Sequence, residues 1–325
     1  GVDWQISGEG AFNFLDSEAA LFNTDASGDY IQQALNHPDT RVEEKRAETF
    51  LTRSWEMSDK LSLQAALGVE YSELSQSGGQ GKQRSFTRPK GYVNASYDLN
   101  ETTVLTARVE REVGQLDFFD FVSSVNVDQG NAETGNPEIV PDQTWLVEFE
   151  VEKNFGDYGA GTLRLYHEQI EDIVDRVPFG PTAEGPGNLD EATRFGAAID
   201  GTLNLDPIGL KGVRLDYEAE TRNSSLDDPL TGERRRIYND LVHWYELELR
   251  YDIPDTSWNV GITVNQEMRA PRYRWEVDRC LSARETSHVQ RGDVVAGQWK
   301  LIEPIPGDSA VCRWRVSNGG AAPCL

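Results

Sequence analysis

The sequence predicts an all-β protein, an antiparallel up-and-down β-barrel that spans a membrane, and three observations lead to this prediction. Eleven segments alternate apolar and polar side chains with a period of two, and most exceed the about 5–6 residues usual for strands of soluble proteins. The connections between them alternate between short and long. The polar face carries rows of like charge, which the packed core of a sandwich does not tolerate.

The predicted strands follow one another through the chain without helical periodicity. The clearest is 61–72, in which Leu61, Leu63 and Leu67 oppose polar residues, and the weakest is 42–55, with Thr49, Leu51 and Arg53 on one face. In order, the strands are expected near 2–14, 42–55, 61–72, 91–99, 103–110, 145–152, 163–168, 194–205, 213–220, 244–251 and 258–264.

The connections divide into two kinds. Turns near residues 58, 100, 157, 208 and 254 are short, whereas those near 25, 79, 128, 183 and 229 are longer and more polar. A Gly/Pro-rich loop is expected over 176–191. Short turns at one end and long loops at the other are typical of membrane barrels, in which closure pairs every backbone group that lipid cannot hydrogen-bond.

Charge and aromatic side chains agree with this fold class. Two strands carry Glu148-Glu150-Glu152 and Asp216-Glu218-Glu220 on one face, which suits a wide, water-filled or plugged lumen. Aromatic rings collect beside the short turns, as expected of rings that settle at headgroup depth. They are Trp55, Tyr97, Phe155, Tyr158, Tyr251 and Trp258. A soluble β-protein with aromatic residues beside its turns is the alternative interpretation.

Composition limits the function classes. The 325 residues carry a formal charge of −24, which argues against a nucleic-acid partner. No run of about 18 apolar residues is present, so the sequence predicts no transmembrane helix. The three cysteines, Cys280, Cys312 and Cys324, have no metal-ligand spacing and are interpreted as incidental thiols.

A proline-bounded stretch, Gly135–Trp145, links the longest central loop to the strand at 145–152. Its sequence, GNPEIVPDQTW, resembles the "G-N-P-x-L-x-P-E-x-[ST]" signature of TonB-dependent outer-membrane receptors, with Ile139 for Leu and Asp142 for Glu. The preceding strand and loop, 107–121, also resembles the family, although Arg111-Glu112-Val113 stands where Arg-Pro is common. Pro137 and Pro141 suit a strand entry because proline cannot donate within a ladder.

The resemblance implies a 22-stranded barrel closed by an N-terminal plug, which imports siderophores, cobalamin or glycans with energy from a TonB complex. On that basis residues 1–278 are expected to be about 11 strands of a larger, incomplete barrel in the outer membrane of a Gram-negative bacterium, without the plug domain. The loop at 135–141 would be extracellular and the turn at 155–158 periplasmic. The expected partners are outer-membrane lipid, TonB through the missing plug, and a small-molecule or glycan substrate.

The alternation stops after Asp278. Residues 279–325 hold six basic and four acidic residues and all the cysteines. We expect this tail to be atypical, either non-native sequence from a shifted or truncated reading frame, or an ordinary insertion or extracellular loop. The nucleotide sequence in the other frames would distinguish these alternatives.

Catalytic and metal-binding patterns are not evident. His37, His167, His243 and His288 are scattered and form no H-E-x-x-H motif, so we expect no enzyme, no catalytic residues, no metal site and no cofactor. Asp227-Asp228 and the acidic loop at 115–142 could bind Ca²⁺, but loop carboxylates are more often simply solvated.

The candidate substrate contacts are Phe118, Phe119 and Phe121, in the longest central loop, which could offer an apolar or stacking surface. Ordinary loop packing is the alternative for these rings. For the whole chain, two other function classes remain open. One is a self-contained surface barrel or adhesin, and the other is a soluble, carbohydrate-binding β-sandwich.

Overall fold

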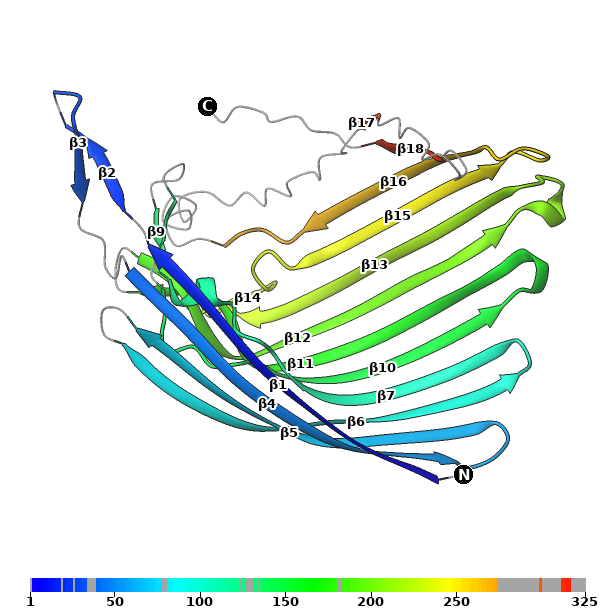
Figure 1. The fold of residues 1–325 in the computed structure, drawn as a ribbon, viewed down its shortest axis with the longest axis horizontal. Helices are drawn as coiled ribbons and strands as arrows, with labels where there is room; N and C mark the ends of the chain where they lie inside the picture. The colour runs from blue at the N-terminus through cyan, green and yellow to red at the C-terminus, as the bar shows by residue number, and fades with distance from the viewer. Residues whose placement is uncertain are drawn as a thin grey trace.

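The computed structural model describes residues 2–18, 20–25, 27–33, 39–77, 81–122, 124–126, 131–133, 135–179, 183–273, 298–299 and 311–316. Most of these residues lie in one strongly curved sheet (Figure 1). Its eleven long strands are β1 (Val2–Glu18), β4 (Asp39–Glu56), β5 (Leu61–Ser77), β6 (Lys82–Asn100), β7 (Thr103–Val113), β10 (Gln143–Asn154), β11 (Gly159–Phe179), β12 (Ala183–Asn204), β13 (Val213–Asp227), β15 (Leu241–Asp252) and β16 (Asn259–Arg269).

Each long strand pairs with the next one along the chain in antiparallel fashion, so the sheet is a simple up-and-down meander. This confirms the predicted fold class and all eleven predicted strands. Among the described residues β1 pairs only with β4, so the sheet is not closed into a complete barrel. Beyond β16 the antiparallel order ends, because β18 (Val311–Val316) runs parallel to it and pairs in turn with β17 (Gln298–Trp299).

The two ends of the sheet differ as predicted. Short turns lie at the right in Figure 1, two of them containing the single-turn 3₁₀ helices η2 (Gly156–Tyr158) and η3 (Asp206–Ile208). The longer connections gather at the left. They hold the β2–β3 hairpin (Leu21–Thr24 and Tyr30–Gln33), the 3₁₀ helix η1 (Phe118–Phe121) with β8 (Ser124–Asn126) and β9 (Asn131–Glu133), and β14 (Arg234–Arg235).

The loop predicted at 176–191 is wrong for most of its length. The β11–β12 ladder continues through it, and Arg176 faces Pro186 while Pro178 faces Glu184. Pro186 is tolerated because β13 pairs with β12 only from Ala192 onward, so no β13 ladder requires an N–H at Pro186, and β9 pairs with β12 only at Glu184. The sheet therefore extends further on the long-loop side than the Gly/Pro composition suggests.

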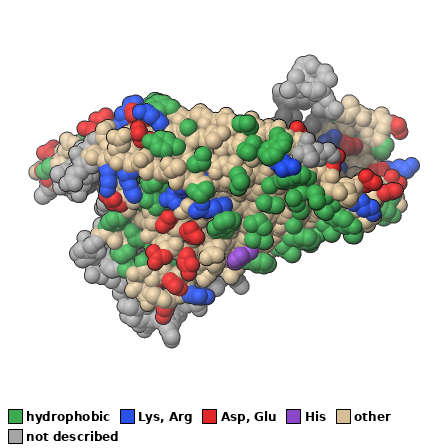
Figure 2. All heavy atoms as spheres, turned by 90° about the horizontal axis from the view of Figure 1, so that it is seen from below, with side chains coloured by type: hydrophobic (Ala, Val, Ile, Leu, Met, Phe, Trp, Pro, Cys, Tyr) green, Lys and Arg blue, Asp and Glu red, His purple; other side chains and the backbone are tan. Residues whose placement is uncertain are grey.

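The two faces of the sheet have opposite character. Apolar side chains gather on the convex face toward the short turns, whereas charged side chains are more frequent toward the long loops and at the short-turn tip (Figure 2). Ile6 and Leu67 on that face are 79% and 77% exposed, which is the reverse of a soluble protein's core. This arrangement is inconsistent with a soluble sandwich, because a sandwich buries its apolar face.

The aromatic girdle also appears where the sequence places it. The rings of Tyr97, Phe155, Tyr158, Tyr251 and Trp258 are all exposed, and each lies at the short-turn end of the sheet. No helix in the described ranges is long and apolar enough to cross a membrane.

Candidate functional site

The concave face of the sheet is polar and charged, and it forms the wall on which any functional site must be built. The predicted rows of carboxylates lie on it, but arginines from neighbouring strands interrupt them. Glu148 faces Arg108 on β7, and its Oε2 lies 3.8 Å from Nε of Arg164 on β11. Near the N-terminal edge, Nζ of Lys90 lies 2.9 Å from carboxylates of both Glu48 and Glu70. The wall is therefore acidic overall but locally paired.

Two loops fold back over this face near its long-loop end, and each buries a small apolar cluster against the wall. The first loop, 114–142, brings Phe121 and Ile139 onto Val42 of β4 and Leu74 of β5. The second, 228–240, brings Ile237 onto a cluster formed by Ile170, Ile173, Ala192 and Leu226 of β11, β12 and β13. Both clusters are almost fully buried, so the loops are part of the folded wall.

The Gly135–Trp145 stretch bridges distant parts of the wall. Its Ile139 is fully buried against β4 and β5, and its Glu138 forms an ion pair with Lys82 of β6. On the other side, Asn188 of β12 accepts a hydrogen bond from the Val140 amide (2.8 Å) and donates to the Val140 carbonyl (2.9 Å). The stretch thus crosses the concave face and joins the two halves of the sheet.

Local geometry explains several residue types in this stretch. The Asn136 side chain accepts a hydrogen bond from the Glu138 amide (2.9 Å), which shapes the turn, and donates to the Pro186 carbonyl (2.9 Å). At the start of the same loop, the Gly114 amide donates to the Asp142 carbonyl (2.9 Å). A Cβ at Gly114 would collide with the Asp142 carboxylate, so a larger residue there would force the Asp142 side chain to move. The stretch has a structural role, as its prolines indicated.

The second loop is held by buried ion pairs. Arg235 of β14 lies between two carboxylates, with Nη2 at 3.2 Å from Asp175 and Nε at 2.6 Å from Asp228. Asp175 also accepts a hydrogen bond from the Tyr238 amide (3.0 Å), and its side chain is completely buried. Because the carboxylates on both sides neutralise the guanidinium, the loop can carry an arginine into a buried position.

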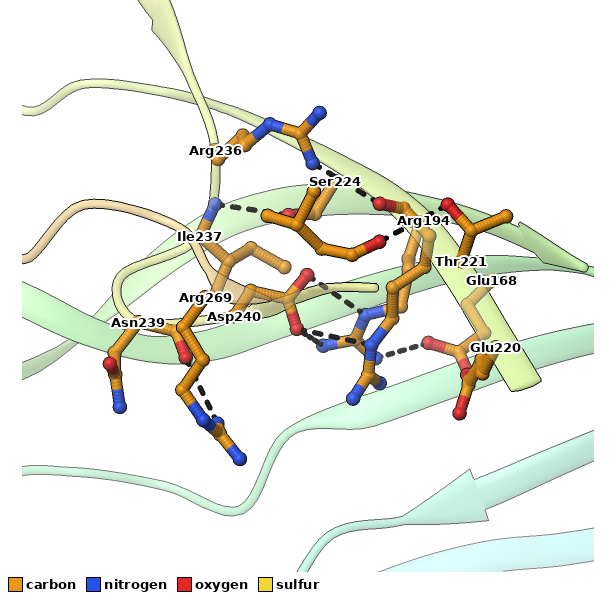
Figure 3. A network of polar contacts seen from close by, with 12 residues as sticks. Glu168, Arg194, Glu220, Thr221, Ser224, Arg236, Ile237, Asn239, Asp240 and Arg269 are labelled. Atoms are coloured by element: carbon orange, nitrogen blue, oxygen red, sulfur yellow. Dashed lines mark hydrogen bonds and ion pairs between the residues drawn. The ribbon is translucent and has the colours of Figure 1, made fainter. Parts of the chain in front are cut away.

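A second network fixes the end of the same loop on the wall (Figure 3). Oδ1 of Asp240 lies 3.3 Å from Nη2 of Arg194 on β12 and 3.7 Å from Nε of Arg222 on β13. Arg194 also pairs with Glu168 of β11. The Asp240 side chain is only 5% exposed, so one loop carboxylate balances two wall arginines.

Carboxylates of the loops have shifted pKa values. Burial raises the pKa of Asp142. Burial also acts to raise the pKa of Asp228, but hydrogen bonds from the Thr231 and Leu230 amides and from Arg235 outweigh it, so this pKa lies below its ordinary value. The hydrogen bond with Lys82 lowers the pKa of Glu138. Asp228 and Glu138 therefore hold their loops as ionised groups.

The three candidate phenylalanines lie together in η1 but face different surroundings. Phe121 is 2% exposed within the first apolar cluster, and Phe118 packs against that cluster. Phe119 is 71% exposed. The structure thus brings the three rings into one turn and leaves one of them accessible from solvent.

Sequence reasoning missed the inward fold of 228–240 and the contacts of Asn188, Arg194 and Asp240. The charged loop resembles any solvated loop in composition, and its sequence does not distinguish the buried Ile237 from the exposed Leu230. In the described ranges no group of three or more His, Cys, Asp or Glu side chains could hold a metal ion. Of the three cysteines, Cys312 lies in β18, and Cys280 and Cys324 lie outside the described residues.

Residues 1–300 match the sequence model of the TonB dependent receptor-like β-barrel. The chain belongs to the TonB-dependent receptor β-barrel family. The family that the Gly135–Trp145 stretch indicated is thereby confirmed. No curated protein matches the sequence.

Solved TonB-dependent receptors share the fold at low sequence identity. The copper transporter OprC aligns with a TM-score of 0.58 at 14% identity, covering 78% of this chain and 39% of its own. The ferric citrate transporter FecA aligns with a TM-score of 0.53 at 15% identity, covering 75% of this chain and 34% of FecA. The alcaligin receptor FauA from Bordetella pertussis aligns with a TM-score of 0.51 at 13% identity, covering 83% of this chain and 47% of FauA. The chain spans less than half the length of each of these three receptors.

Proposed function

We propose that this chain forms part of the wall of an outer-membrane transporter that takes up a scarce small molecule or glycan, and that it is not an enzyme. The observation that supports this most directly is the pairing of faces. An exposed apolar band on the convex side fits lipid, and a charged concave side lined by two inward-folded loops fits an aqueous path. Family membership adds the expectation of energy coupling to TonB.

Substrate contact is proposed for the η1 turn at the long-loop end. Phe119 is the candidate that reaches solvent, and Phe118 and Phe121 would hold its position from the packed side. An exposed ring on a turn anchored by one buried and one partly buried ring can stack on an apolar or planar ligand at low entropic cost. Siderophore, cobalamin and glycan substrates remain the proposed classes.

The function is tested by uptake in the source bacterium. A strain lacking the gene is grown with single limiting sources of iron, cobalamin or oligosaccharide, with a strain lacking TonB as the reference. We expect a growth defect on one source, shared by both strains and restored by the wild-type gene. Normal growth of the gene-deleted strain on every source that requires TonB would contradict the transport proposal.

The surface-barrel or adhesin alternative has one observation in its favour. The β2–β3 hairpin exposes Phe22, Tyr30 and Ile31, and it projects beyond the end of the sheet (Figure 1). Exposed apolar residues on a projecting hairpin suit contact with another macromolecule. A triple change of these residues to serine that abolishes surface attachment while uptake stays normal would favour this alternative.

A further inference from the structure

An arginine on the apolar convex face marks a second site, far from the long loops. Arg53 lies on β4, three residues before the strand ends at Glu56, and it pairs across the sheet with Trp4 of β1. Its guanidinium carbon lies 4.7 Å from the centre of the Trp4 ring and 4.6 Å from that of Trp55. The cation is therefore held between two indoles.

Arg53 differs from other arginines at the short-turn end of the sheet, because its side chain has no anionic partner among the described residues. Two arginines near the same end of the sheet are paired with carboxylates, since Arg214 lies 2.9 Å from Asp216 and Arg250 lies 2.8 Å from Asp252. In the described part of the chain the Arg53 side chain forms no hydrogen bond or ion pair, and its Nε is buried without an acceptor. The guanidinium keeps unused donors among the exposed apolar side chains of the convex face.

The depth of the site agrees with a headgroup layer. Trp55 belongs to the ring of aromatic residues beside the short turns, with Tyr97 and Trp258. Tryptophan prefers the boundary between hydrocarbon and headgroups, and an arginine near a span's end can extend its charge toward that boundary. A guanidinium binds phosphate through two parallel N–H donors, which a lysine cannot do.

An apolar row continues from the site toward the middle of the band. Ile6, Leu51 and Leu67 are cross-strand neighbours on β1, β4 and β5, and they are 79%, 45% and 77% exposed. Leu51 lies two residues from Arg53 on the same face. A ligand with a phosphate on Arg53 would thus lay its hydrocarbon along this row.

We propose that Arg53, Trp4 and Trp55 bind the phosphate of a membrane phospholipid in the leaflet at the short-turn end. The site rests on the proposed membrane location of the barrel. It requires the lipid rather than free phosphate because the apolar row beside the cation contributes contact that inorganic phosphate cannot use. The bound lipid would fix the height of β1 and β4 in the bilayer.

The test places the full chain in nanodiscs of phosphatidylethanolamine and phosphatidylglycerol. Native mass spectrometry of the released protein then counts the lipid molecules that it retains. Arg53→Gln is expected to retain roughly tenfold less lipid, because it loses a charge-assisted, two-donor contact. Arg214→Gln is the matched control, because it removes a concave-face arginine near the same end, and it should retain lipid as the wild type does. An excess of inorganic phosphate should leave retention unchanged.

Each other outcome has a definite meaning. If the Arg53→Gln variant inserts and retains as much lipid as the wild type, the proposed site is wrong. The site is also wrong if inorganic phosphate displaces the lipid completely. If Arg53→Gln fails to insert, Arg53→Lys replaces it, and retention equal to wild type by that variant contradicts binding through the guanidinium fork. Failure of the wild-type chain to enter nanodiscs would instead refute the membrane proposal, which separates the two ideas.

Discussion

Single buried charges decide whether the inward loops stay on the wall. Asp240 is the clearest case, because it faces both Arg194 and Arg222 and is nearly inaccessible. Asp240→Asn keeps the shape but removes the carboxylate partner of Arg222 and leaves Arg194 with Glu168 alone, and we expect a loss of about 3 kcal/mol in the free energy of opening of loop 228–240. Hydrogen exchange of the loop amides measures this quantity.

The control for that change is an exposed ion pair in the same loop region. Asp227 and Arg234 are 3.7 Å apart, and their side chains are 76% and 83% exposed. Asp227→Asn should alter the opening free energy by less than about 1 kcal/mol, since exposed pairs contribute little. Equal effects of the two substitutions would show that burial of Asp240 does not matter for the loop.

Asn188 makes a similar argument for a neutral side chain. Its side chain accepts a hydrogen bond from the Val140 amide and donates one to the Val140 carbonyl, as a neighbouring strand would. Asn188→Ala leaves the Val140 amide and carbonyl unpaired, and a cost of about 1–3 kcal/mol follows from burying each unmet polar group. Exchange of the Val140 amide should accelerate accordingly, whereas Asn204→Ala, which removes a long hydrogen bond of 3.4 Å at the exposed turn end, should not change it.

At the scale of an element, the loop 228–240 should respond to acid through Asp228. Its pKa lies below its ordinary value of 3.8, so the ionised form stabilises the loop at all pH values above about 4. This contribution is lost as pH falls from 3.8 through the folded-state pKa, because protonation removes the charge that Arg235 and the two amides contact. Exchange at Leu230 and Thr231, corrected for intrinsic rates, measures the change.

The matched variant for this pH dependence is Asp228→Asn, which cannot ionise. Its loop should be less protected than wild type at pH 6, and the difference between the two proteins should shrink as pH falls below 3.8. A difference that stays constant down to the lowest pH would mean that the charge of Asp228 does not hold the loop.

The long strands are the elements that sequence alone predicts best. A period of two is a local property, and over ten or more residues it identifies a strand such as β5 with little dependence on its neighbours. Composition misleads where the fold changes the meaning of a residue. Pro186 suggested a loop, but it pairs with Arg176 in the β11–β12 ladder, because β13 does not pair with β12 at this position. The inward loops depend on contacts between residues more than 40 positions apart, such as Arg194 with Asp240, which no local pattern reveals.

The register of the strands supplies a test of which face meets lipid. Val147 is 52% exposed on the convex face, whereas its neighbour Leu146 faces Glu110 and Glu168 on the concave side. Val147→Lys should cost about 2–4 kcal/mol because it places a charge within the apolar band. Leu146→Lys should cost far less, since two carboxylates flank the new ammonium. The difference is measured by urea unfolding of the protein refolded in lipid vesicles, and a reversed order would exchange the two faces.

For the whole molecule, the two ends of the sheet should lie on opposite sides of the outer membrane. The family resemblance places the long loops outside and the short turns in the periplasm. A variant with Cys280, Cys312 and Cys324 changed to serine provides a background without thiols. In this background, Thr231→Cys lies at the long-loop end and Asp157→Cys lies in the η2 turn, and both residues are exposed. A maleimide that cannot cross the outer membrane should label only Thr231→Cys in intact cells and both variants after lysis. Labelling of Asp157→Cys alone in intact cells would reverse the orientation, and labelling of both would show that the chain does not span the membrane.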